Sequence, residues 1–377
     1  MNIDSWRRFW VGGVALALLA VLGFALGDPR AESSLPRVAV PNGGICPDVV
    51  FQAGTLQVVF GREGGDTYYT RSADEGKTLS TPVRINSGSS RATLGHERGP
   101  KLAIGRSGSI HVAWLGSGGK QVFYASSTDG GQRFSSPRNL VADDRGVDGA
   151  TIAADDSGHV SVVWLGGGEG PDSPVSSLIQ LASSDDNGNT FAPPRTVASD
   201  YPGGACACCN LKASVGPGGS LLIGFRGAYR SIRDMYVLRG MPDARRFEAT
   251  RVSDDRWRLD ICPMQGLSLQ VTDRPPQIGV AWMSEGRVYR SFSTDGGKSF
   301  RPRIAPARAY NGSRRDPIAP TNPQGETLFA WVEGRSVYWE RSGSSGRVVH
   351  SGENGGLPSN SKPAAFVDRS GNFALVY

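Results

Sequence analysis

One apolar pattern recurs seven times along the chain, roughly every 50 residues, and this repeat restricts the possible folds more than any other feature. Each copy is a short run of apolar, β-branched and aromatic residues, which is typical of a buried strand. The copies are TLQVVFG (55–61), IHVAWLG (110–116), VSVVWLG (160–166), LLIGFRG (221–227), IGVAWMS (278–284), LFAWVEG (328–334) and FALVY (373–377). A second strand precedes each copy, and two more follow most of them. Four strands per unit predict an all-β chain folded as a β-propeller.

The repeat predicts seven blades. Six units are complete, and a seventh begins at Lys362 and contains two strands before Tyr377. The segment LPRVAV (35–40) matches the outer strands TPVRI and RPRIA of other units. We therefore expect this segment to complete the seventh blade, which would join the two ends of the chain and remove an exposed sheet edge.

A second motif lies in the turn after the third strand. It reads STDGGQRF (127–134), SDDNGNTF (184–191) and STDGGKSF (293–300), with SADEGKTL (72–79) as a weaker copy. An Asp carboxylate in such a turn accepts backbone N–H groups, glycine supplies a positive φ, and the aromatic residue packs against the blade. These carboxylates are therefore predicted to be structural.

This turn, S-x-D-x-G-x-x-F in four-stranded units, resembles the Asp-box, or BNR, repeat of the sialidase (neuraminidase) superfamily, and the resemblance covers nearly all of residues 36–377. It implies carbohydrate chemistry, namely an exo-sialidase-type glycoside hydrolase. Such a site holds the substrate carboxylate with several arginines and uses a Tyr nucleophile, assisted by a Glu, with an Asp as acid/base. Sialidases have six blades, so a six-bladed ring is the alternative to seven.

The first 34 residues form a separate segment ahead of the propeller at 35–377. Arg7 and Arg8 precede eighteen uncharged residues, 9–26, which as one hydrophobic helix are just long enough to cross a membrane. The segment is either an uncleaved membrane anchor or a removed signal peptide. Both readings place the propeller outside the cytoplasm, in the periplasm or the extracellular space, where disulfides persist.

The charge distribution argues against a nucleic-acid partner. The formal net charge of +6 is modest, and no dense basic run is interleaved with aromatic residues. The sequence carries no indication of an oligomeric state. A glycan or another small molecule bound at the propeller mouth is the expected partner, together with the membrane through residues 9–26.

The innermost strands of a propeller run in one direction, so the segments that lead into them should meet at one mouth. Those segments are ICPD (45–48), HERGP (96–100), VDGA (147–150), ACACCN (205–210), DICPM (260–264), SRRDP (313–317) and NSKP (360–363). All five cysteines of the chain fall in this set. The thiols are therefore predicted to share the mouth.

The cysteines allow three readings. Cys46 and Cys262 could each form a disulfide with the triple-cysteine loop, which would join three loops. Alternatively, Cys46, Cys206, Cys208, Cys209 and Cys262, with His96 nearby, could bind copper or zinc, because thiolate and imidazole ligands suit these soft metals. A reactive or redox thiol is the third reading.

Glu97, Arg98, Arg315 and Asp316, in the same segments, are candidates for catalysis, and Arg233, in RSIRDMY (230–236), is a further one. The sialidase pattern is incomplete, because its early Arg-Ile-Pro motif is replaced by ICPDVVF and no Tyr pairs with a Glu on the final blades. Three functions stay open: a sialidase-like hydrolase, a non-catalytic propeller that binds a glycan or a protein, and a periplasmic metal or thiol protein.

Overall fold

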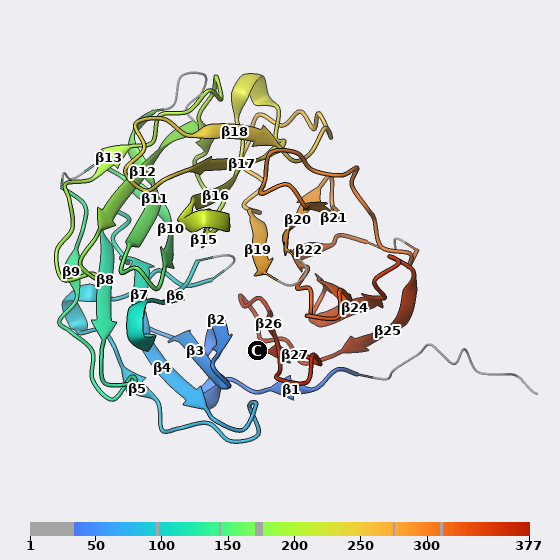
Figure 1. Ribbon diagram of the computed structural model, residues 1–377, viewed down its shortest axis with the longest axis horizontal. Coiled ribbons are helices and arrows are strands. Elements are labelled where there is room, and N and C mark those ends of the chain that lie inside the picture. The colour runs from blue at the N-terminus through green and yellow to red at the C-terminus, as the bar shows by residue number, and fades with distance from the viewer. Residues whose placement is uncertain (1–33, 96–97, 143–144, 170–175, 274–275, 310–311) are drawn as a thin grey trace, which may run out of the picture.

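The computed structural model describes residues 34–95, 98–142, 145–169, 176–273, 276–309 and 312–377. These residues form seven β-sheets arranged around a central axis, and Figure 1 looks along that axis. The protein is therefore a seven-bladed β-propeller, and the six-bladed alternative is wrong. The only helical elements in the described ranges are five 3-10 turns: η1 (Pro41–Gly43), η2 (Gly88–Ser90), η3 (Arg106–Gly108), η4 (Pro217–Gly219) and η5 (Tyr229–Ser231).

Each blade follows the predicted order of strands, with the first strand along the chain innermost. The first blade consists of β2 (Ile45–Gln52), β3 (Thr55–Arg62), β4 (Asp66–Ser72) and β5 (Val83–Arg84), and the second of β6 (Lys101–Ile104), β7 (Ile110–Leu115), β8 (Val122–Ser127) and β9 (Arg138–Asn139). The third contains β10 (Val147–Ala154), β11 (Val160–Glu169), β12 (Ser176–Ser184) and β13 (Arg195–Thr196), and β14 (Ala205–Cys206) also pairs with β12.

The remaining blades vary in their outer strands. The fourth consists of β15 (Lys212–Val215), β16 (Leu221–Arg226), β17 (Met235–Gly240) and β18 (Glu248–Arg251), and the fifth of β19 (Leu267–Asp273), β20 (Pro276–Ser284) and β21 (Arg287–Ser293). The sixth contains β22 (Arg315–Ile318), β23 (Thr327–Glu333), β24 (Ser336–Ser342) and β25 (Val348–Asn354), and the seventh β26 (Ala364–Val367), β27 (Phe373–Val376) and β1 (Arg37–Val38). In the fifth blade a single bridge between Arg290 and Ile304 takes the place of a fourth strand.

The recurrent tryptophans are core residues, as the repeat predicts. Trp114, Trp164, Trp282 and Trp331 are each at most 2% exposed. Each packs with apolar residues of its own blade and of the preceding blade along the chain. The second strand of each unit is apolar on both faces because it is covered by a neighbouring blade on each side.

The two ends of the described chain meet in the seventh blade. β1 pairs with β27, with Arg37 opposite Leu375, which confirms the predicted closure. The pairing differs in detail from the expectation, because β1 lies directly beside β27 and runs parallel to it, whereas the outer strands it resembles are antiparallel. Asn354 secures the entering chain: its side chain accepts from Leu35 N at 3.0 Å and donates to Leu35 O at 2.9 Å.

The repeated turns have one hydrogen-bond pattern. In the copy at 184–191, Gly188 N donates to Ser184 Oγ at 2.9 Å, and Thr190 N donates to Asp186 Oδ1 at 2.8 Å. The same bonds occur in the turns at 72–79, 127–134 and 293–300. Gly188 has φ +81°, and a Cβ there would lie 1.8 Å from the Tyr124 hydroxyl oxygen. These carboxylates hold turns together, as predicted, at the outer end of the blades.

No helix in the described ranges is long and apolar enough to cross a membrane. The hydrophobic segment 9–26 lies outside the described residues.

Candidate functional site

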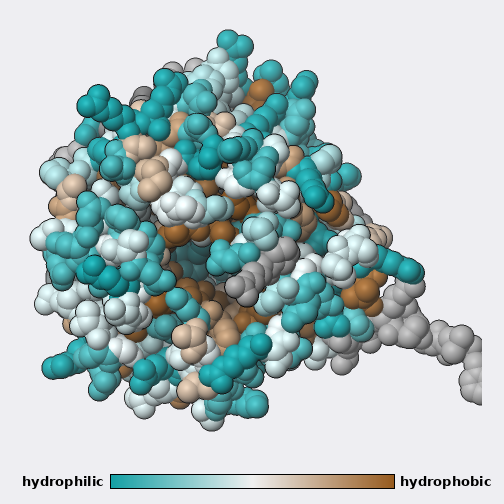
Figure 2. All heavy atoms as spheres, viewed as in Figure 1, coloured by the Kyte–Doolittle hydropathy of each residue, from teal (hydrophilic) through white to brown (hydrophobic). Residues whose placement is uncertain are grey.

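The inner strands of six blades, together with the segment that follows β22 in the sixth blade, line an axial cavity of about 670 Å³. Figure 2, drawn along the same axis, shows the molecule hollowed at its centre. A smaller chamber of about 110 Å³ lies toward the starts of these strands, where Asp48, Lys212, Asp316 and Lys362 contribute to its wall. The segments that lead into the inner strands surround this end, which is the predicted mouth.

Three cysteine sulfurs meet at the mouth between the fourth and fifth blades. Cys209 Sγ lies 3.1 Å from Cys206 Sγ, and Cys262 Sγ lies 3.5 Å from Cys206 Sγ and 3.6 Å from Cys209 Sγ. We call these three residues the sulfur cluster. No imidazole or carboxylate of the described residues joins them within metal-binding distance.

Local backbone structure holds the cluster in place. Cys206 lies in β14, opposite Ser176 at the start of β12, and Cys209 N donates to Cys206 O at 3.3 Å. On the other side, Met264 N donates to Cys262 Sγ at 3.3 Å. The C-x-C-C spacing therefore folds Cys209 back onto Cys206, and the loop before β19 brings in Cys262.

A disulfide joins Cys208 to Cys262. It connects the loop before β15 to the loop before β19, so the prediction that Cys262 bonds to the triple-cysteine loop agrees with the structure. The Cys262 sulfur thus takes part in a disulfide and also contacts both other sulfurs of the cluster.

Cys46 does not join the sulfur cluster and forms no disulfide, so the structure corrects both expectations for this residue. It opens β2 of the first blade, which lies across the ring from the fourth and fifth blades (Figure 1). Its thiol donates to Asn360 O at 3.4 Å, and its backbone N–H donates to Ser361 Oγ at 3.0 Å. Burial raises the pKa of the Cys46 thiol, so this cysteine has the environment of a packing residue.

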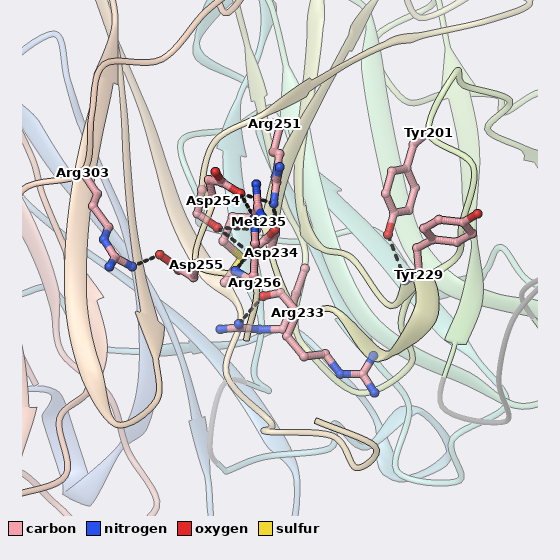
Figure 3. Close-up of polar contacts among 12 residues, drawn as sticks. Tyr201, Tyr229, Arg233, Asp234, Met235, Arg251, Asp254, Asp255, Arg256 and Arg303 are labelled. Carbon is pink, nitrogen blue, oxygen red and sulfur yellow. Dashed lines mark hydrogen bonds and ion pairs between the residues drawn. The ribbon is translucent and has the colours of Figure 1, made fainter. Parts of the chain in front are cut away.

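Arg233 lies beside the cluster and is completely buried. Its Nε donates to Leu259 O at 2.9 Å, whereas Nη1 and Nη2 have no hydrogen-bond partner among the described residues. Figure 3 shows its guanidinium turned away from the neighbouring ion pair of Asp234 and Arg251. Arg233 therefore carries a buried positive charge with unused donors.

Arg226, equally buried, has a different environment. It donates to three backbone carbonyls, those of Gln265, Arg233 and Met283, at 2.7 to 2.8 Å. Its guanidinium also lies over the ring of Trp257, at 5.4 Å from the ring centroid. One face of the Trp257 ring is thus covered by Arg226.

The sulfur of Cys206 is in a positive environment. The pKa of its thiol is lowered to about 7, because the hydrogen bond from Cys209 and the charges of Arg233 and Arg226 outweigh the opposing effect of burial. A thiolate is the nucleophilic and metal-binding form of cysteine. At Cys206 the surroundings therefore favour the thiolate.

The described catalytic candidates take part in separate contacts. Arg98, before β6, pairs with Asp148 on β10, with Nε to Oδ1 at 2.7 Å. Arg315 pairs with its neighbour Asp316 on β22, and Asp316 N donates to Gln265 Oε1 at 3.0 Å. Arg233 lies close enough to Cys206 for its charge to lower the pKa of that thiol. His96 and Glu97 lie outside the described residues.

The channel contains a group of charges that the sequence-based candidates omitted. Lys212 Nζ lies 3.2 Å from Asp48 Oδ1, and Leu102 N donates to Asp48 Oδ2 at 2.9 Å. Burial, followed by the nearby charge of Lys362, lowers the pKa of Lys101 to about 7. A sequence signal was present for two of these residues, because KLAI (101–104) and KASV (212–215) each begin an inner strand with lysine.

Comparisons with known proteins place the fold. No family model matches the sequence, and no curated protein matches it. Among solved structures, a Hadza microbial sialidase aligns with a TM-score of 0.50 at 14% identity, over 82% of this chain and 66% of that one. The chain thus spans slightly less than two thirds of the sialidase.

Two further structures align over nearly their whole length. The six-bladed fucose-recognising lectin of Aleuria aurantia has a TM-score of 0.53 at 12% identity, covering 86% of this chain and 98% of the lectin. An α-L-arabinanase of Penicillium chrysogenum has a TM-score of 0.50 at 13% identity, covering 86% of this chain and 96% of the arabinanase. At these identities the likeness establishes the propeller fold.

Proposed function

We propose that this protein is an exported propeller that binds a glycan at its mouth. The observation that carries the proposal is the pair of Arg–Asp ion pairs there, Arg98 with Asp148 and Arg315 with Asp316. The side chains of Arg98 and Arg315 are 18% and 34% exposed, so each is fixed by its carboxylate yet reaches solvent. A guanidinium held beside a carboxylate suits sugar hydroxyls, because the guanidinium donates hydrogen bonds and the carboxylate accepts them. Little side-chain entropy is lost on binding, since both groups are already held in place.

The similar structures support the same class of ligand. The aligned proteins are a sialidase, a lectin that recognises fucose and an α-L-arabinanase complexed with arabinobiose. This support is an analogy between folds, because one propeller scaffold hosts many functions. The ion pairs at the mouth are the feature of this chain that connects the analogy to particular residues.

Sialidase-type hydrolysis is the second candidate, favoured by the alignment with a sialidase and by the repeated Ser-x-Asp turns. Its candidate residues are Glu97, Arg98, Arg233, Arg315 and Asp316. In a hydrolase of this type the arginines would converge on the substrate carboxylate. Arg98 and Arg315 instead each pair with a carboxylate of the protein, which favours binding over turnover.

Export through residues 9–26 is part of the proposal. The disulfide between Cys208 and Cys262 supports it, because disulfides persist mainly in oxidising compartments. Cell fractionation followed by protease treatment of intact spheroplasts tests this point. Digestion of the propeller from outside would support export, and protection from protease would contradict it.

Glycan binding is tested by screening the full chain against an array of sialylated, fucosylated and arabinose-containing oligosaccharides. For a ligand that is retained, Arg98→Ala is expected to weaken affinity by about 10-fold, the loss typical of a charged hydrogen bond. Arg133→Ala is the matched control, since this arginine is 88% exposed in a peripheral turn. Absence of any retained glycan, or equal losses in both variants, would contradict the proposal.

The same preparation separates binding from turnover. Release of the fluorophore from a 4-methylumbelliferyl sialoside, abolished by Arg315→Ala, would establish the hydrolase. Retention of a glycan without release of product would establish the binding protein.

A further inference from the structure

The sulfur cluster has the spacing of a metal site. Its three sulfurs form a triangle with sides of 3.1, 3.5 and 3.6 Å. A metal ion about 2.3 Å from each sulfur, the usual zinc–thiolate distance, would lie about 1 Å out of their plane. That position leaves a fourth coordination position on the side of the ion away from the sulfurs, as tetrahedral geometry requires.

The ligand type restricts the metal. Only sulfur is offered by the described residues, and sulfur selects soft, thiophilic ions such as Zn(II) and Cu(I) over hard cations. Two of the three residues, Cys206 and Cys209, are buried, so an ion there would be shielded from competing water.

The environment of Arg233 is independent evidence for a metal ion bound by the thiolates. A buried charge is costly unless an opposite charge or hydrogen-bond acceptors compensate it. Both terminal nitrogens of this fully buried guanidinium lack a partner among the described residues. Three thiolates around a divalent ion carry a net charge of about −1, and around a monovalent ion about −2, so the complex would compensate the guanidinium.

We propose that Cys206, Cys209 and Cys262 bind a thiophilic metal ion, Zn(II) or Cu(I), and that Arg233 is the positioning residue that balances the charge of the thiolates. This site is separate from the Arg–Asp pairs on which glycan binding rests. The two proposals can therefore fail independently.

The disulfide makes this site dependent on reduction. A dithiol breaks the bond between Cys208 and Cys262: two electrons and two protons pass to the two cysteine sulfurs, and the dithiol becomes a disulfide. The three cluster thiols then lose their protons to solvent as the metal ion binds. The disulfide and the complete metal site thus exclude each other, since both use the Cys262 sulfur.

The test measures metal uptake by the full chain under anaerobic conditions. Zn(II) and Cu(I) are titrated separately against a colorimetric chelator, before and after treatment with a dithiol. The reduced protein is expected to bind about one equivalent of at least one of the two ions, and the disulfide form much less. The competition also identifies which ion binds more tightly.

Matched variants assign the ligands. Cys206→Ser and Cys209→Ser are expected to abolish uptake, whereas Cys46→Ser, which removes a buried cysteine outside the cluster, is expected to retain it. Cys208→Ser frees Cys262 and is expected to bind metal without dithiol treatment. Circular dichroism of each variant verifies that loss of uptake is not loss of folding.

Arg233 is tested by Arg233→Gln and Arg233→Lys. Arg233→Gln is expected to lower metal affinity by about 10-fold at unchanged stoichiometry, the loss typical of a residue that interacts with the metal ligands. Arg233→Lys keeps the positive charge and is expected to retain most of the affinity. The metal site is overturned if the folded, reduced protein binds neither ion, or if Cys46→Ser impairs uptake as much as Cys209→Ser. Equal affinities of Arg233→Gln and the parent protein would overturn the role of Arg233.

Discussion

Asp48 on the first blade and Lys212 on the fourth form an ion pair across the channel, with Oδ1 and Nζ 3.2 Å apart. The two residues are 164 positions apart in sequence, and their strands, β2 and β15, are not neighbours in the ring. The Asp48 carboxylate also accepts the backbone N–H of Leu102 on β6. One carboxylate thus connects the inner strands of three blades.

Removing the lysine of this pair should destabilise the propeller. Lys212→Met leaves the Asp48 carboxylate without its closest cation, and we expect the free energy of unfolding to fall by about 2 kcal/mol. Urea unfolding measures this loss. The double variant Asp48→Asn with Lys212→Met should recover part of it, because neither charge is then left uncompensated. A double variant less stable by the sum of both single losses would contradict this coupling.

Lys101 predicts a dependence of stability on alkaline pH. Burial, then repulsion from Lys362, lowers the pKa of Lys101 to about 7 in the folded protein, against about 10.4 in an unfolded chain. Between these values the unfolded chain binds a proton that the folded protein does not, so stability rises with pH, by up to about 1.4 kcal/mol per unit. Lys101→Met should flatten this rise in urea unfolding between pH 7 and 9.5. An unchanged slope in the variant would refute the assignment.

Closure of the ring depends on Asn354. Its side chain bonds to both backbone groups of Leu35 and accepts the Trp339 indole N–H at 3.0 Å. Asn354→Ala leaves these buried groups without partners, so we expect a loss of about 2 to 4 kcal/mol and faster proteolysis near residue 35. The exposed Asn139→Ala, whose side chain bonds only within its own turn, is the control and should change stability by less than about 0.5 kcal/mol. Similar losses in both variants would argue against a role of Asn354 in closure.

The turn carboxylates predict a sensitivity to acid. Hydrogen bonds from Thr190, first, and from Ser184 lower the pKa of Asp186 to about 2. The ionised Asp186 carboxylate stabilises the folded protein at pH values above the ordinary pKa of Asp, and this stabilisation is lost as the pH falls toward 2. Asp186→Asn should therefore lower the melting temperature at pH 7 but make little difference at pH 2. Its neighbour Asp185, 84% exposed, offers the control Asp185→Asn. A difference that persists at pH 2 would show that charge is not the cause.

The blades, their order and the turns between them follow from local signals in the sequence. Each signal lies within a short segment of the chain. The signals are the apolar strand pattern, the Ser-x-Asp-x-Gly turn and the outer-strand motif that residues 35–40 share with other units. Their hydrogen bonds form within one hairpin or between adjacent strands. Such features can be predicted from sequence because each depends on few residues close together in the chain.

Only the tertiary structure decides which residues lie together in the candidate sites. The sequence indicates that all five cysteines approach one mouth, but Cys46 reaches it from the far side of the ring while Cys206, Cys209 and Cys262 come into contact. The same applies to Arg98 and Arg315, whose carboxylate partners lie on β10 and β22, and to the burial of Arg233. These relations depend on how loops from different blades pack against one another, over distances of a few ångströms that no local pattern encodes.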